Sequence, residues 1–393
     1  MTLNDDRLDY SARGRRVALA GFLVAIAGFA AGPLLAGPDR FLRSYLVSFA
    51  YFLSLALGGL FFVLLQHLTK AGWSVLVRRL AEAVATAVVP LAVLCLPVLW
   101  ALPSLYRWAD PDHAAGDPLI AHKSGYLNVE FFVARWVLYF VCWCSYALYF
   151  HKLSREQDES GDPSLTIRME RASTHGMILY AVTQTFAAFD LLMSLDPHWF
   201  STIFGVYFFG GSTVAIFSLL AVMLVRLQQA GYLQRSITAE HYHDIGKFLF
   251  GFVIFWAYIA YSQYMLIWYA DIPEETEWFL KRQSGDWARV GLLLIVGHFL
   301  VPFLFLLSRV PKRRKGALAA VALWVLAMHW VDLYWVVMPE FSPGRVPLSI
   351  ADLAGLAAVG GVFVAWTAHR LGRAPLAPVR DPRLAESLAL ENA

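Results

Sequence analysis

The sequence is poor in charged residues and in cysteine. Only 16% of its 393 residues are charged while 59% are hydrophobic, and the mean hydropathy is +0.55. This balance excludes an ordinary soluble domain, in which about a quarter of the residues are charged. The three cysteines, Cys95, Cys142 and Cys144, lie in apolar runs, without the spacing of a disulfide or zinc framework and without a C-x-x-C-H haem motif. We therefore expect no metal site and no covalently bound cofactor, and the net charge of +3 does not point to nucleic acid.

Apolar runs long enough to cross a bilayer recur along the whole chain. About 20 mainly apolar residues in a helix span the hydrocarbon core. The ten runs cover roughly 17–37, 41–66, 75–102, 127–151, 174–195, 202–227, 245–270, 287–309, 316–338 and 348–369. We expect an all-α polytopic membrane protein with one ten-helix domain over 17–370. A polar N-terminal segment, 1–16, without a signal-peptide cleavage site, and a polar C-terminal tail, 371–393, complete the chain.

The distribution of Lys and Arg predicts the orientation of the spans. Of the 32 Lys and Arg residues, 23 fall on one side of the ten spans, 8 fall on the other side, and Arg135 lies inside the fourth span. Because cytoplasmic segments carry the excess of positive charge, we expect both termini in the cytoplasm.

Two sequence patterns recur four spans apart. Asp190 precedes Pro197 by the same distance at which Asp332 precedes Pro339, and a leucine follows each acid. Spans three and seven also end alike, in WADP at 108–111 and YADIP at 269–273. Such repeats relate the halves of many membrane proteins by an axis along the membrane normal. We expect two four-helix bundles, spans two to five and six to nine, with spans one and ten peripheral. The alternative is a general preference of helix ends for Trp, Asp and Pro.

An ionisable side chain within a membrane span is costly and by default marks a proton, ion or substrate path. Asp190 lies about six residues inside the outer end of span five, a depth of ~9 Å at ~1.5 Å per residue. Arg135 lies at a similar depth in span four. Neighbouring helices would bring the two together as an ion pair, with either a structural or a functional role.

The second acid has histidines near it. His329 and Asp332 are three residues apart in span nine and therefore share a helix face, and His298 of span eight lies near the same depth. The cytoplasmic half holds Glu82 in span three and His175 at the start of span five. Imidazoles and buried carboxyls exchange protons near neutral pH. We expect these residues, with the pair in the first repeat, to form a proton pathway. Pairing of Glu82 with the preceding arginines and capping of a helix by His175 are the alternatives.

Three further polar residues lie towards the outer side. Gln263 in span seven is a candidate lining residue of a quinone pocket or a packing contact between helices. Asp196 and His198 stand at the outer corner after span five. For His241 and His243, at the start of span seven, we favour a solvated interface over a metal site.

Two long segments carry a resemblance to a known family. They are TFAAFDLLMSLDPHWFSTIFGVYFFGGS, Thr185 to Ser212, and YSQYMLIWYADIPEET, Tyr261 to Thr276. In these segments, and in its number of spans, the chain resembles the membrane subunits of bacterial alternative complex III, a quinol:cytochrome c oxidoreductase. It is most similar to the second of the two large quinone-binding-type subunits, usually called F. Both subunits belong to the wider NrfD or polysulfide-reductase membrane-subunit family.

The resemblance implies a location in the bacterial inner membrane and a fold of two four-helix bundles with flanking helices. It implies a complex that oxidises menaquinol or ubiquinol at the outer side. The implied partners are a sister quinone-binding membrane subunit, an iron–sulfur subunit, haem c cytochromes and a terminal oxidase, with lipid around them. Carried onto this sequence, the intramembrane acid of the family motif is Asp190, and the outer corner is Asp196, Pro197 and His198. Leu191 stands where many relatives have an aromatic residue.

We therefore expect a subunit without a redox centre of its own, which contributes a proton pathway and a quinone pocket near the outer side. Two other functions stay open. One is a self-contained proton-coupled secondary transporter, a class whose helices are usually broken near mid-membrane in both halves. The other is a di-haem cytochrome b, for which only His298 and His329 approach a facing pair.

Overall fold

The computed structural model describes residues 6–391, which form helices and turns and contain no strand. Within these residues, ten helices or stacks of helices are long and apolar enough to cross a membrane, and each overlaps one of the expected spans. This confirms an all-α polytopic membrane protein. A helix satisfies every backbone amide and carbonyl within one segment, as the water-free hydrocarbon core requires.

Eight spans are each built on one long helix. They are α1 (Ser11–Ala36), α2 (Pro38–Leu68), α9 (Val129–Ser160), α10 (Ser164–Leu191), α11 (Phe204–Gln229), α12 (Ala239–Ala270), α17 (Lys315–Val337) and α18 (Ile350–Leu371). The third span is a stack of α3 (Val75–Ala85), α4 (Val88–Leu94) and α5 (Leu96–Trp100), and the eighth is a stack of α14 (Asp286–Leu293), the π-helical segment η4 (Leu294–Leu300) and α15 (Val301–Leu307). The short helices outside the spans are α6 (Leu102–Leu105), α7 (Pro111–Ala114), α8 (Pro118–Lys123), α13 (Pro273–Gln283), α16 (Arg309–Arg313) and α19 (Leu384–Leu388). Proline, which removes a helix hydrogen bond, stands in the first turn of both α5 and α15.

Four helices extend well beyond the apolar runs that predicted them, and one of them is α12, which begins at Ala239 where the expected span began at 245. Helix α9 continues to Ser160 and α10 begins at Ser164, although the expected spans ended at 151 and began at 174. Helix α1 begins at Ser11, although the expected span began at 17. Hydropathy marks only the apolar part of a helix, and these additional turns are polar and lie outside it.

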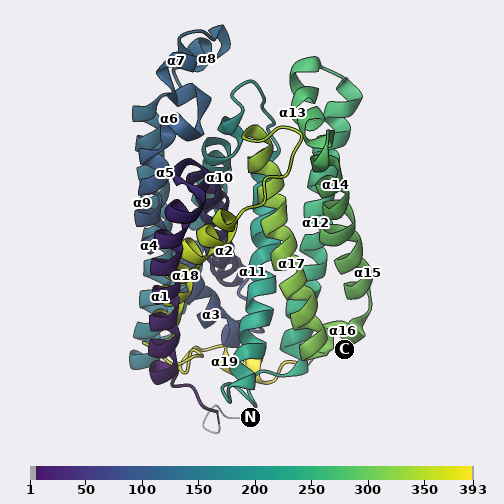
Figure 1. Cartoon of the computed structure of the whole chain (residues 1–393). Coiled ribbons are helices and arrows are strands. Elements are labelled where there is room, and N and C mark those ends of the chain that lie inside the picture. Colours follow the sequence, from purple (N-terminus) through teal and green to yellow (C-terminus); the bar gives the residue numbers. More distant parts are fainter. Residues whose placement is uncertain (1–5, 392–393) are drawn as a thin grey trace.

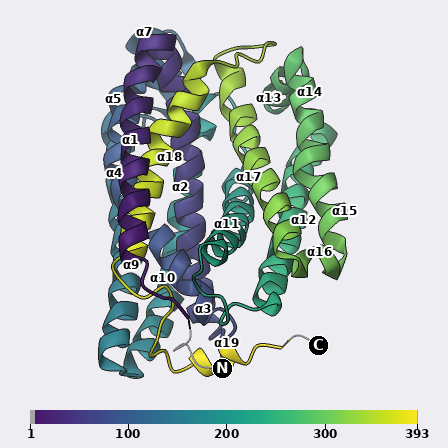
Figure 2. The same ribbon diagram turned by 60° about the horizontal axis from the view of Figure 1, so that its bottom comes forward.

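The ten spans form two four-helix bundles and one peripheral pair (Figures 1 and 2). The first bundle contains α2, the third span, α9 and α10, and the second contains α11, α12, the eighth span and α17. In each bundle the first helix packs against the second and the fourth, and the two first helices, α2 and α11, pack against each other. In α2, 94% of the most apolar window is buried, compared with 22% in α1. Helix α2 is therefore the centre of the molecule.

The two peripheral helices, α1 and α18, pack against each other along their length, and α18 also packs against α2. Glycines in both helices make this close approach possible. A Cβ atom on Gly28 would lie 2.4 Å from the backbone nitrogen of Ala358, and one on Gly361 would lie 2.5 Å from that of Ala25. Small residues bring helix backbones together in membranes, where van der Waals packing drives association.

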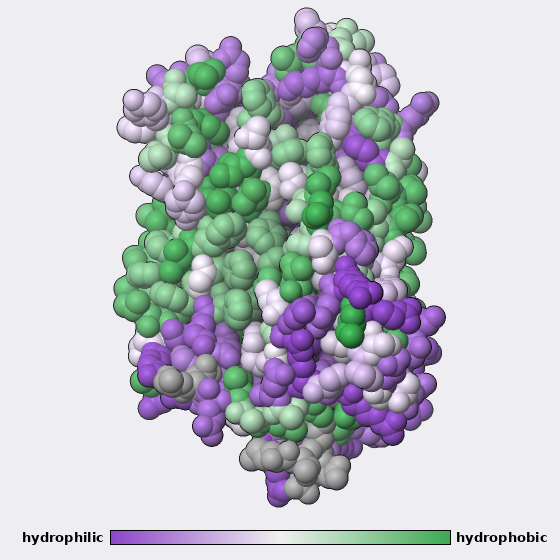
Figure 3. Space-filling view, turned by 180° about the vertical axis from the view of Figure 1, so that it is seen from behind, coloured by the Kyte–Doolittle hydropathy of each residue, from purple (hydrophilic) through white to green (hydrophobic). Residues whose placement is uncertain are grey.

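Both termini lie at the same end of the molecule (Figure 1), and we call this end the cytoplasmic face, following the count of Lys and Arg. Figure 3 shows apolar side chains over the middle of one side and polar ones gathered towards the ends, most densely at the cytoplasmic face. The C-terminal tail is docked there. Asp381 pairs with Arg78, and Ser387 donates a hydrogen bond to the carbonyl of Trp73 at 2.7 Å.

Candidate functional site

Arg135 of α9 and Asp190 of α10 form a buried ion pair in the outer half of the first bundle, as their depths predict. The guanidinium donates from Nε to Asp190 Oδ2 at 2.8 Å and from Nη2 to Oδ1 at 2.9 Å. The Tyr139 hydroxyl donates to Oδ2 at 2.9 Å, and Arg135 Nη1 donates to the carbonyl of Tyr126 at 3.0 Å. Asp190 is fully buried. Each carboxylate oxygen therefore has a charged donor, and the arrangement is a closed, bidentate pair.

Asp332, at the corresponding place in the second bundle, has different partners. It is buried in α17, where Tyr207 of α11 donates its hydroxyl to Oδ1 and Trp256 of α12 donates Nε1–H to Oδ2 at 3.2 Å. Within the described residues it forms no ion pair with Lys or Arg. Both of its partners are neutral donors, so this carboxyl group can gain or lose a proton without breaking an ion pair.

Two histidines lie around the side chains that hold Asp332: His329 is three residues before it on α17, and His298 contacts its partner Trp256. His329 Nε2 lies 2.8 Å from the hydroxyl oxygen of Ser54 on α2, and the ring centroid of His298 lies 4.0 Å from that of Trp256 and 6.2 Å from that of His329. Among the described residues, His329 Nδ1 and both ring nitrogens of His298 are buried without a hydrogen-bond partner. Such atoms are rare in folded proteins and call for a functional or solvent partner. We call the group of Asp332, His329, His298, Tyr207, Trp256 and Ser54 the Asp332 cluster.

The backbone around the Asp332 cluster is adapted to it. His298 lies in η4, and π-helical turns occur frequently at functional sites. Gly211 of α11 lies against the imidazole, since a Cβ atom there would be 2.6 Å from His329 Cε1. A side chain at 211 would displace this ring.

Glu82 belongs to a separate cluster in the cytoplasmic half of the first bundle. Its carboxylate oxygens lie 3.5 Å from Arg78 Nε and 3.4 Å from Arg79 Nε, and Glu82 is buried. Arg79 also pairs with Asp158 at 2.6 Å, and Arg78 pairs with Asp381 of the tail. Glu82 therefore pairs with the arginines that precede it, which was the alternative to a proton-path role.

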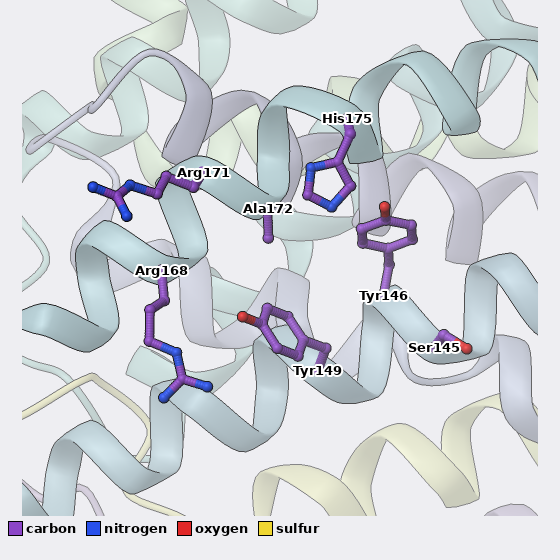
Figure 4. Close-up of a pocket in the computed structure, with 7 residues that line it drawn as sticks. All are labelled: Ser145, Tyr146, Tyr149, Arg168, Arg171, Ala172 and His175. Atoms are coloured by element: carbon purple, nitrogen blue, oxygen red, sulfur yellow. The ribbon is translucent and has the colours of Figure 1, made fainter.

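Sequence reasoning missed two histidines near this cluster. His67 of α2 and His151 of α9 are buried, and within the described residues His67 Nε2 and both nitrogens of His151 have no hydrogen-bond partner. Each stands at the cytoplasmic end of its apolar run, where hydropathy alone predicts an interfacial residue. No signal in the sequence distinguishes these two histidines from His175. The structure does: His175 is exposed and faces a cavity between α9 and α10, and Glu82 is not among the residues that line it (Figure 4).

The outer residues form a third group, away from the Asp332 cluster. Gln263 Oε1 accepts a hydrogen bond from the Ser201 hydroxyl at 3.1 Å, and His198 Nε2 lies 2.7 Å from Asp117 Oδ2. A lining role for Gln263, Asp196 and His198 in a quinone pocket stays a prediction.

Asp196 and Lys281 connect the outer ends of the two bundles with a 2.8 Å ion pair. Burial raises the pKa of Asp196, but the hydrogen bond and charge of Lys281 outweigh burial, so this pKa is lowered. Burial lowers the pKa of Lys281, but the hydrogen bond to Asp196 and the charge of Glu340 outweigh it, so that pKa is raised. Burial lowers the pKa of the neighbouring Arg282 to about 10, although Glu340 opposes this. The pair is therefore charged around neutral pH.

The described residues contain no group of three or more His, Cys, Asp and Glu side chains placed to hold a metal ion. The interpretation of His241 and His243 as a solvated interface is wrong, because both are buried. His241 Nδ1 accepts a hydrogen bond from the backbone N–H of Thr238 and so caps α12, and its Nε2 lies 3.3 Å from the hydroxyl of Ser387 in the tail. The docked tail excludes water from this corner.

A scan against protein-family models and a search of curated proteins each found no match to this chain. The functional argument therefore depends on the residues described above and on the resemblance given in the sequence analysis.

Proposed function

We propose that this chain is an integral membrane subunit of a respiratory quinol:cytochrome c oxidoreductase of the alternative complex III type, and that its Asp332 cluster transfers protons in the outer half of the membrane. The type of complex follows from the resemblance in the segments 185–212 and 261–276. Proton transfer is supported by the geometry of the cluster. The substrate of the complex would be menaquinol or ubiquinol, which releases two protons and two electrons on oxidation.

One observation carries the proposal. The carboxyl group of Asp332 has no cationic partner among the described residues, and the imidazoles near it have ring nitrogens without a hydrogen-bond partner. Asp332 is bonded only by neutral donors among the described residues, and His298 and His329 hold three unpartnered ring nitrogens close by. Ser54 continues the chain of polar atoms from His329 to α2, in the other bundle. Acidic and His chains of this kind, buried inside a helical bundle, serve as proton relays in membrane proteins.

The Arg135–Asp190 pair has a supporting role in this proposal. A carboxylate fixed by two guanidinium hydrogen bonds and a tyrosine hydroxyl must break a bidentate ion pair before it accepts a proton. Its geometry favours the structural alternative, in which it connects α9 to α10. The cluster around Glu82, which is also paired with arginine, would act in the same way at the cytoplasmic half.

In this proposal electron transfer comes from partner subunits. The sequence lacks a haem-attachment motif, and the described residues lack a metal-ligand group. An iron–sulfur subunit and haem c cytochromes are the partners that the resemblance implies, and in this proposal the chain supplies the proton-conducting part of the assembly.

The proposal is tested by replacing Asp332 with Asn in the assembled complex. Asparagine keeps the size of the side chain and cannot release a proton. We expect quinol:cytochrome c turnover, or proton release per electron, to fall at least tenfold while the subunits stay together. The matched control is Asp352→Asn, which changes a buried carboxylate that pairs with Arg40 at 2.9 Å outside the cluster. Wild-type turnover and proton release in the Asp332 variant would contradict the proposal.

The positions of the two interrupted spans support the transporter alternative less well than the oxidoreductase. Transporters with internal repeats break equivalent helices in both halves. Here the interruptions lie in the third span and the eighth span, which are the second helix of one bundle and the third helix of the other. A colourless, stable monomer on purification would favour the transporter, whereas co-purification with haem c subunits would favour the oxidoreductase.

A further inference from the structure

A cavity of about 460 Å³ opens between α9 and α10 near the cytoplasmic face. It is lined by Ser145, Tyr146, Tyr149, Arg168, Arg171, Ala172 and His175 (Figure 4). The basic residues follow one another at 168, 171 and 175 on α10, so they share one face of that helix. Ser145 and Ala172 are small and leave the space open. None of these residues belongs to the Asp332 cluster or to the cluster around Glu82.

Among the described residues neither arginine of this cavity forms a close ion pair, and both are exposed. The acidic residues closest to them in the sequence are engaged elsewhere. Glu170 pairs with Arg383 at 2.9 Å and with Lys70 at 3.7 Å. Asp162 accepts two hydrogen bonds from Ser164, from the backbone N–H at 2.8 Å and from the hydroxyl at 2.6 Å. The hydrogen bonds from Ser164 and, to a smaller extent, the charge of Arg168 lower the pKa of Asp162. Two guanidinium groups are therefore available to an anion from outside the chain.

The tyrosines complete a set of donors. The described residues include no hydrogen-bond acceptor for the hydroxyl of Tyr146 or of Tyr149. In Figure 4 the Tyr149 hydroxyl is turned towards the side of the cavity that holds the arginines, and the Tyr146 hydroxyl towards His175. Gly176 allows this arrangement, because a Cβ atom there would lie 2.9 Å from Tyr146 Cε1. Guanidinium groups with hydroxyl donors beside them are typical of phosphate sites.

An exposed apolar strip continues from the cavity towards the outer side. On α10, Ile178 is 64% exposed and Val182 is 50% exposed, and on α9, Val141 is 57% exposed and Leu138 is 55% exposed. Ile178 lies three residues beyond His175, a rise of ~4.5 Å. A free anion would make no favourable contact with these apolar side chains, whereas the acyl chains of a phospholipid would lie along them.

We propose that this cavity binds the phosphate headgroup of an anionic phospholipid of the cytoplasmic leaflet, with Arg168 and Arg171 contacting the phosphate, the tyrosines donating hydrogen bonds, and the acyl chains lying along Val141 and Ile178. Basic pockets between membrane helices at this leaflet bind anionic headgroups in other proteins. The proposal is independent of the proposed function and of the redox partners.

The test is native mass spectrometry of the full-length chain, purified with any subunits that accompany it and titrated with phosphatidylglycerol or phosphatidylcholine. We expect wild-type protein to retain phosphatidylglycerol in preference to phosphatidylcholine, and the Arg168→Gln/Arg171→Gln variant to bind phosphatidylglycerol at least tenfold more weakly, since each interfacial basic residue contributes about fivefold. The matched control is Arg15→Gln/Arg16→Gln. It removes the same amount of charge from exposed positions on α1, which also lie near the cytoplasmic face.

A second variant tests the cavity rather than the charge. Ser145→Phe fills the space from an exposed position on α9 and keeps both arginines, and we expect it to weaken phosphatidylglycerol binding as well. Each variant is first checked for wild-type thermal stability and elution volume. Three results would overturn the proposal: equal loss in the α1 control, equal binding of phosphatidylcholine, or displacement of the lipid by inorganic phosphate at the same concentration, which would identify a free-anion site.

Discussion

At the scale of single residues, one side-chain type at corresponding positions of the two bundles has two environments. Asp190 is fixed by Arg135, while Asp332 is held by a hydroxyl and an indole N–H. The matching depths of Asp190 and Arg135 in the sequence were enough to predict their pair. The partners of Asp332 could not be predicted in this way. Tyr207 and Trp256 are ordinary members of apolar runs, 125 and 76 residues distant in the chain, and only the packing of three helices brings them together.

This difference predicts stability losses of different size for the same substitution at the two positions. Asp190→Asn leaves the Arg135 guanidinium buried without its counter-charge, and we expect a loss of roughly 3–5 kcal/mol in the free energy of unfolding. Asp332→Asn removes no ion pair, and we expect a loss of about 1–3 kcal/mol. Denaturant titration of each variant in detergent measures both values.

The double variant Arg135→Met/Asp190→Leu is the control for this prediction. Because it removes both charges together, it should recover most of the stability lost in Asp190→Asn. An Asp190→Asn variant as stable as the wild type would show that the ion pair does not hold α9 to α10.

At the scale of helices, hydropathy identified each span but neither its full length nor its neighbours. The additional turns at Ser11, Ser160 and Ser164 are polar and gave no apolar signal. His175 lies at the start of the expected span, and its ring packs against Tyr146 and lines the cavity. Its place in a proton pathway with Glu82 stays a prediction. The direction in which His175 points depends on the rotation of α10 about its own axis. The sequence of α10 has no pronounced apolar face from which this rotation could be predicted.

Helix packing predicts the consequence of enlarging a glycine in the peripheral pair. Gly28→Leu places a side chain where even a Cβ atom would lie 2.4 Å from the backbone of α18, so the two helices must separate. We expect the midpoint of thermal unfolding to fall, with a loss of about 1–3 kcal/mol in the free energy of unfolding, as is usual for overpacking. The neighbouring exposed residue Ala27 provides the control, since Ala27→Leu faces outwards and should leave the midpoint unchanged. Equal effects of the two substitutions would contradict the packing of α1 on α18.

The connection between α13 and the corner after α10 predicts a pH dependence. The folded pKa of Asp196 lies below its ordinary value, mainly because Lys281 outweighs burial. The stabilisation is therefore fully present above the pKa of the unfolded chain, near 4, and is lost as the pH falls through the lower folded pKa. Thermal unfolding of wild type and Asp196→Asn between roughly pH 6 and pH 2 should converge towards the acid end. Parallel curves would show that Asp196 has no coupling to Lys281.

At the scale of the whole molecule, each copy of the sequence repeat corresponds to one four-helix bundle, and the two bundles are in contact through α2 and α11. The acid-to-proline spacing after Asp190 and Asp332 was a sufficient signal for this architecture, because it marks the same helix end twice. The clusters inside the bundles were only partly predictable. Asp332, His329 and His298 come together as expected, but Ser54 reaches them from the opposite bundle, and no pattern within one span could indicate a contact between bundles.

The most direct test of the account is redox-induced infrared difference spectroscopy of the assembled complex. If the Asp332 carboxyl exchanges a proton during quinol oxidation, the wild-type spectrum will contain a carbonyl band of a protonated carboxylic acid that disappears in Asp332→Asn and persists in Asp190→Asn. A spectrum in which the band is lost only in the Asp190 variant, or in neither variant, would contradict the assignment of proton transfer to the Asp332 cluster.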